Sequence, residues 1–85
     1  MPKYGLHVNH PNNKARIHVV GGCALVRRAL ERAQVGEPYG PIRGDRNGYW
    51  DWFDTLQDAE VAQRETGKTT LGRCRLGPCR DLFTR

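Results

Sequence analysis

Two residue pairs with the same spacing constrain this chain more than any other feature. His18 and Cys23 are five positions apart, and so are Cys74 and Cys79 near the other end of the sequence. Structural zinc sites use four ligands, preferably thiolate sulfur and imidazole nitrogen. One site built from all these residues would join two distant segments, and closing so long a loop strongly constrains the unfolded chain.

The chain needs such a connection because it has few apolar residues for its size. It has 85 residues, and one residue in five is Leu, Ile, Val or Phe. Small domains with thin cores usually depend on a metal, a disulfide or a partner. We therefore expect one domain over residues 1–85, held together by a structural zinc ion. The predicted ligands are His18, Cys23, Cys74 and Cys79, with His7 in reserve.

Two other interpretations of the cysteines stay open. Cys74 and Cys79 could form a disulfide, or all of the cysteines could be small buried thiols. The chain has no secretory signal pattern and no stretch of about 20 apolar residues that would span a membrane. We therefore expect a cytoplasmic protein without membrane contact. Disulfides are rare in that compartment, and three cysteines cannot all pair.

The first twenty residues predict a β-hairpin. The segments "KYGLHVN" and "KARIHVV" alternate in polarity, and "HPNN" between them is typical of a turn. If Asn9 pairs with Lys14, one face of the hairpin is apolar and the other is polar. This register places His18 on the polar face with His7 diagonal to it. The zinc ion is then expected on the back of the hairpin, under the C-terminal segment.

Two helices and two further strands are predicted after the hairpin. Apolar residues at helical spacing predict a helix over 24–34, and Thr55 is a capping residue for a second helix that Gly67 ends. "YWDWFD" and "KTTL" are typical of short strands, with Trp50 and Trp52 on one face as core residues.

These elements predict an α+β fold. We expect a small antiparallel sheet, made of the N-terminal hairpin plus two further strands, with two helices on one face and zinc as a staple. Residues 36–48 are rich in glycine and proline and are expected to form a long loop, and residues 80–85 a frayed tail.

Three segments together resemble a known group of proteins. "ARIHVVGGC", "FDTLQDAEVAQRETG" and the C-terminal cysteine pair resemble small prokaryotic and phage zinc-binding modules. That group has an H-x4-C pair, a T-x-x-E/D-A helix and a terminal cysteine pair, and occurs alone or attached to restriction-type nucleases. The resemblance implies a structural zinc and a role near nucleic acids or defence, and it implies no catalytic residue.

The charge distribution indicates an anionic partner. The net charge is +5, gathered in residues 1–47 and 73–85, and eleven of the fourteen cations are arginine, which binds phosphate bidentately. We expect a non-enzymatic module that binds nucleic acid mainly through phosphates, with little base readout. The predicted contact residues are Lys14, Arg16, Arg27, Arg28, Arg32, Arg43, Arg46, Arg73, Arg75 and Arg80.

The same charge pattern fits a second class of function. A protein-interaction module, such as a phage-encoded inhibitor or accessory subunit, would bring its basic surface to an acidic partner. An enzyme is not expected, because Cys23 and His18 have no visible orienting group or oxyanion loop. The sequence indicates no small-molecule substrate and does not define the oligomeric state.

Overall fold

The N-terminal hairpin forms in the register that its residue pattern predicts. Strand β1 (Tyr4–Asn9) pairs antiparallel with strand β2 (Lys14–Val19), and Asn9 lies opposite Lys14. In the turn between them, Asn13 adopts a left-handed conformation with a φ of 53°. Asparagine tolerates this conformation better than most residues, so the turn suits its sequence.

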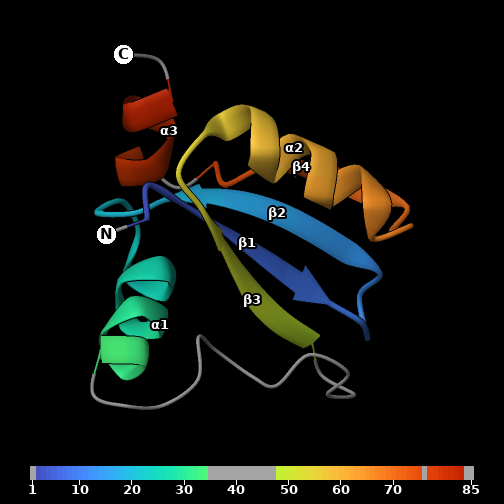
Figure 1. The fold of residues 1–85 in the computed structure, drawn as a ribbon, viewed down its shortest axis with the longest axis horizontal. Coiled ribbons are helices and arrows are strands. Elements are labelled where there is room, and N and C mark those ends of the chain that lie inside the picture. Colours follow the sequence, from blue (N-terminus) through green and yellow to red (C-terminus); the bar gives the residue numbers. More distant parts are fainter. Residues whose placement is uncertain (1, 35–47, 76, 84–85) are drawn as a thin grey trace.

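Two more strands extend the hairpin into a four-stranded sheet. The computed structural model describes residues 2–34, 48–75 and 77–83. Strand β3 (Gly48–Phe53) pairs antiparallel with β1, and strand β4 (Thr70–Arg73) pairs parallel with β2. The strand order is β3-β1-β2-β4 (Figure 1).

The predicted α+β fold is confirmed, but the prediction of an antiparallel sheet is wrong for β4. Helix α2 (Leu56–Glu65) connects β3 to β4. A helix between two strands returns the chain to the end where it started, so the two strands run in the same direction. Because β1 is antiparallel to both β2 and β3, this direction makes β4 parallel to β2.

Helix α2 covers the apolar face of the sheet. It begins as predicted, with the side chain of Thr55 accepting a hydrogen bond from the amide of Asp58 at 3.1 Å. Further along the helix, Nε2 of Gln63 donates to the carbonyl oxygens of Ala15 and Gly72 at 2.7 and 2.8 Å, which ties α2 to β2 and β4. The buried core on this face consists of Leu6, Val8, Ala15, Ile17 and Ala59.

Helix α1 (Ala24–Gln34) has the predicted limits but lies on the opposite face from α2 (Figure 1). Its residues Val26 and Ala29 pack with Trp50 on that face. The prediction of two helices on one face is therefore wrong. Strand alternation turns His18 away from α2 and toward the face that α1 covers. Cys23 directly precedes α1, and its Sγ contacts His18 on this face. We call this face the metal side.

A third helix, α3 (Gly77–Phe83), replaces most of the predicted frayed tail. Cys79 within it is fully buried, and the ring of Phe83 stacks on Tyr4 with centroids 6.4 Å apart, so the segment is anchored at both ends. Residues 84 and 85 lie outside the described residues. So does the predicted loop over 36–48, except Gly48, which begins β3. In the described parts of the chain, none of the helices has the length and apolar character needed to cross a bilayer.

Candidate metal centre

Four buried side chains from distant parts of the chain converge on the metal side. They are His18 of β2, Cys23 before α1, Cys74 after β4 and Cys79 of α3, and their potential ligand atoms all lie within 4.8 Å of one another. These are the residues that the matched spacing in the sequence predicts as ligands. The structure brings all of them together and places them behind the hairpin, as the register predicted.

The distance between Cys23 and Cys74 suits two ligands of one metal ion and not a disulfide between these residues. The Sγ atoms of Cys23 and Cys74 are 3.9 Å apart, and Sγ of Cys23 lies 3.3 Å from Nδ1 of His18. Two thiolates bound tetrahedrally to one zinc ion, at about 2.3 Å each, lie about 3.8 Å apart. A disulfide would need about 2.05 Å. The cysteines, Cys79 included, are free thiols in this structure.

Glycine at position 22 permits the close approach of the two ligand segments. A Cβ atom there would overlap with Sγ of Cys79 and would lie 2.9 Å from the carbonyl oxygen of Val19. The absence of that atom lets the amide of Cys23 donate to Sγ of Cys79 at 3.2 Å. Gly21 beside it has a φ of 90°, a conformation that favours glycine. The Gly-Gly step is therefore part of the site and not only a break between elements.

His18 is held in the neutral form that binds metals. Burial lowers its pKa to about 4, and the nearby charges of His7 and Arg16 act in the same direction. The residue is 3% exposed. A metal ligand must be the unprotonated imidazole, so near neutral pH the site does not have to displace a proton from His18.

Cys23 is prepared for metal binding by its position at the start of α1. Burial raises the pKa of its thiol, but hydrogen bonds from the amide of Val26, from Cys79 and Cys74, and from the amide of Leu25 lower it by more. The net pKa lies below its ordinary value. Amide groups at a helix start favour negative charge, so this thiol is biased toward the thiolate that a metal binds.

His7, the reserve ligand, lies outside the cluster. Its ring stacks on Trp50 with centroids 4.7 Å apart and stays 6.4 Å from the ring of His18.

Trp50 also contacts His18, with ring centroids 5.1 Å apart, and stacks on Trp52, with centroids 5.5 Å apart. The tryptophans share one face of β3, as strand alternation predicts, and Trp50 is a core residue. Sequence reasoning missed that Trp50 also forms the wall behind His18, because that contact depends on which strand pairs with β1.

Two of the predicted basic contact residues share a hollow with the candidate ligand His18. Lys14 and Arg16 alternate with buried residues along β2 and share the face of His18. They line a hollow of about 210 Å³, which we call the hairpin hollow. Its described lining residues are His7, Asn9, Asn12, Lys14, Arg16, His18 and Leu25.

The remaining predicted contact residues are more scattered. Arg27 and Arg28 are exposed on α1, Arg75 is exposed directly after Cys74, and Arg80 of α3 lies 3.8 Å from Asp81. The side chain of Arg32 and all of Arg43 and Arg46 lie outside the described residues.

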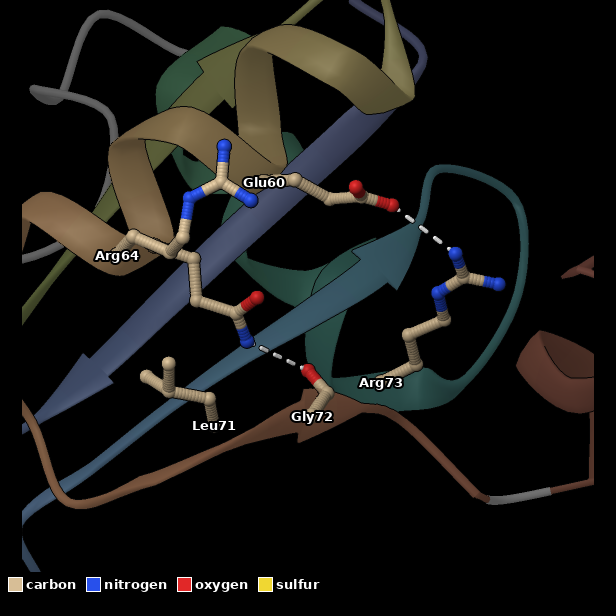
Figure 2. A pocket seen from close by; sticks show the side chains of 6 residues that line it. Glu60, Arg64, Leu71, Gly72 and Arg73 are labelled. Carbon is tan, nitrogen blue, oxygen red and sulfur yellow. Dashed lines mark hydrogen bonds and ion pairs between the residues drawn. The ribbon is translucent and has the colours of Figure 1, made fainter.

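Arg73, another of the predicted contact residues, lies on the α2 side of the sheet. It lies opposite the buried Ile17, and its guanidinium forms an ion pair with Glu60 of α2 at 2.9 Å (Figure 2). The same guanidinium lies over the ring of Phe83, 5.1 Å from its centroid. A hollow of about 310 Å³ lies between α2 and β4, lined by Glu60, Gln63, Arg64, Leu71, Gly72 and Arg73. In Figure 2, Leu71 lies on the other side of Gly72 from the Arg73–Glu60 pair. These contacts give Arg73 a role in the packing of α2 and α3.

Comparison with protein-family models, curated proteins and solved structures found no match to this chain. The fold and the ligand geometry therefore carry the functional argument.

Proposed function

We propose that the metal is zinc and that its role is structural. Three buried thiols and one imidazole form a donor set that zinc prefers, and four protein ligands complete its tetrahedral shell. A closed shell leaves no position for a substrate or an activated water, so the site holds the fold together and performs no catalysis. The resemblance to small zinc-binding modules in the sequence points to the same role.

The domain that zinc stabilises binds nucleic acid through its metal side. The observation that carries this proposal is the separation of charge across the sheet. Lys14 and Arg16 of β2 lie on the metal side, and α1 on that side adds the exposed Arg27 and Arg28.

The opposite side of the sheet carries four of the seven described carboxylates. Asp51 of β3 shares the face of Leu6, and α2 adds Asp58, Glu60 and Glu65. The α2 side also carries Arg64 and Arg73, but there the four carboxylates outnumber the cations. A phosphate backbone is therefore attracted more strongly to the metal side and prefers one orientation. Cations from separate segments of the sequence thus lie on one side of the sheet, which supports a binding surface there.

Titration of labelled single-stranded and duplex DNA and RNA, followed by fluorescence anisotropy, tests this function. Between about 50 and 200 mM salt, affinity should fall linearly in a log–log plot, because binding releases counterions from phosphates. Arg28→Ala should weaken binding to all sequences equally and reduce the salt slope by about 1.

Arg64→Ala provides the matched control. It removes the same charge from a helix position that is also exposed, but on the α2 side. It should leave affinity and slope nearly unchanged. If the wild-type protein binds no nucleic acid at about 50 mM salt, this function is wrong. An acidic protein partner then becomes the better explanation of the basic surface.

A further inference from the structure

The hairpin hollow has the composition of an anion site. Lys14 and Arg16 are two residues apart on one strand face, which separates their Cα atoms by roughly 7 Å. Asn9 lies opposite Lys14, and His7 lies opposite Arg16, so two rows of polar side chains face the same space. Among the described residues that line the hollow there is no carboxylate. Among these residues an incoming anion meets two cations and the amides of Asn9 and Asn12.

His18 connects this hollow to the metal centre. Its Nδ1 faces Sγ of Cys23 at 3.3 Å, and the same residue also lines the hollow. When Nδ1 of a neutral imidazole binds a metal, the ring proton must sit on Nε2. The metal therefore makes Nε2 a hydrogen-bond donor on the side of the ring that points away from the ligand cluster.

Helix α1 continues the positive surface beyond the hollow. Leu25 of α1 lines the hollow while remaining 52% exposed. Arg28 lies three residues later, on the same face of the helix. A strand with one phosphate in the hollow could therefore place a neighbouring phosphate against Arg28.

We propose that the hairpin hollow is a phosphate site in which Lys14, Arg16 and the Nε2–H of metal-bound His18 contact one phosphate group. The inference rests on the proposed function for the source of that phosphate, a nucleic-acid strand, but the site itself is defined by its own residues. Metal loading and phosphate binding are then coupled, because the metal fixes the tautomer that donates. By thermodynamic reciprocity, each must strengthen the other.

Long-range ¹H–¹⁵N spectra of the zinc-loaded, ¹⁵N-histidine-labelled protein test the contact directly. Inorganic phosphate and a short 5′-phosphorylated oligothymidylate serve as probes. Each should shift the Nε2–H signal of His18 and leave the signals of His10 unchanged. The double variant Lys14→Ala with Arg16→Ala should lose this shift and bind the oligonucleotide at least ten times more weakly, at unchanged zinc content.

The control double variant removes the same charges from α2 and from the segment between α2 and β4. Arg64→Ala with Lys68→Ala should keep the His18 shift for both probes. A shift of His18 that survives in the Lys14 and Arg16 variant, or that is absent from the wild-type protein, overturns the phosphate site.

The two probes separate this inference from the proposed function. If the oligonucleotide binds the wild-type protein and the Lys14 and Arg16 variant with the same affinity, the phosphate site is wrong and nucleic-acid binding stands. If inorganic phosphate shifts His18 but the oligonucleotide does not bind, the site is supported and nucleic-acid binding is wrong. If neither probe binds, both are wrong.

Competition with a zinc chelator measures the coupling. A saturating amount of the oligonucleotide should raise the zinc affinity of the wild-type protein several-fold and should have no such effect on the Lys14 and Arg16 variant. Equal zinc affinity with and without bound oligonucleotide contradicts the proposed contact from His18.

Discussion

The Sγ atoms of Cys23 and Cys74 lie 3.9 Å apart, although the residues are separated by 51 positions in the chain. Their contact connects the segment between β2 and α1 to the residue that follows β4. Cys79 of α3 belongs to the same cluster. Among the described residues, the core clusters on the two faces of the sheet contain six and five buried residues. The ligand cluster is therefore where the two ends of the domain are held together. A metal ion at this place would therefore act on the whole fold.

The purified protein should contain one zinc ion per chain. Three thiols and an imidazole whose ligand atoms lie within 4.8 Å of one another suit a tetrahedral zinc site. Native mass spectrometry and a metal assay on protein purified under reducing conditions measure this. A metal-free protein with a disulfide between Cys74 and Cys79 would contradict the metal centre.

Replacing any one ligand should remove most of the folding stability. Structural zinc in small domains contributes about 10–16 kcal/mol of binding free energy, which is larger than the stability of most domains of this size. Each of four single variants should therefore unfold much of the chain, as measured by circular dichroism and thermal melting: Cys23→Ser, Cys74→Ser, Cys79→Ser and His18→Ala.

His10→Ala is the control and should melt like the wild-type protein. His7→Ala should lose its stacking on Trp50 but keep zinc, whereas loss of zinc in that variant would mean that the ligand assignment is wrong.

Gly22→Ala should weaken metal binding without removing a ligand. The added Cβ would overlap with Sγ of Cys79, so either the Gly-Gly turn or α3 must shift. Forced overpacking of this kind costs about 1–3 kcal/mol. Chelator competition and thermal melting report the change. Gly72→Ala is the matched control, since a Cβ at that position would have no neighbour within 4 Å, and an equal loss in both variants would argue against the steric explanation.

Gln63→Ala should destabilise the packing of α2 on the sheet. The Gln63 side chain donates to the carbonyl oxygens of Ala15 and Gly72 at 2.7 and 2.8 Å, and removing it leaves both acceptors without this donor. The expected loss is about 1–3 kcal/mol in the free energy of unfolding, measured by urea denaturation. The exposed Gln57→Ala on the same helix should change the stability by less than about 0.5 kcal/mol. Zinc content should stay the same in both variants.

Folding stability should fall as the pH drops from about 6.5 to about 4. The pKa of His18 is lowered from 6.5 to about 4 by burial and by the charges of His7 and Arg16. Between these values the unfolded chain binds a proton that the folded chain does not bind, so acid favours unfolding. The difference amounts to about 3 kcal/mol over the whole window, and protonation of the thiolate ligands acts in the same direction. Urea denaturation at pH 7, 6 and 5 measures the trend, and a stability that is flat or rises toward pH 5 would contradict it.

The sequence by itself determined the local elements and the candidate ligands. The hairpin register, the limits of α1 and the cap at Thr55 follow from alternation, helical periodicity and capping chemistry, which act between residues close in the chain. The ligand residues were predictable because each pair is local and the two pairs have the same spacing. The alternation also indicated that His18 faces away from the apolar side of the hairpin.

Only the tertiary structure decided how these elements are arranged. The parallel pairing of β4, the placement of α1 opposite α2 and the helix around Cys79 all depend on contacts between residues far apart in the chain. Local propensity carries no information about such contacts, since strand order and helix placement follow from which apolar surfaces bury one another. The same contacts decide that Arg73 pairs with Glu60 while Lys14 and Arg16 share a hollow with His18. In the sequence all of these cations look alike, and their different neighbours give them different roles.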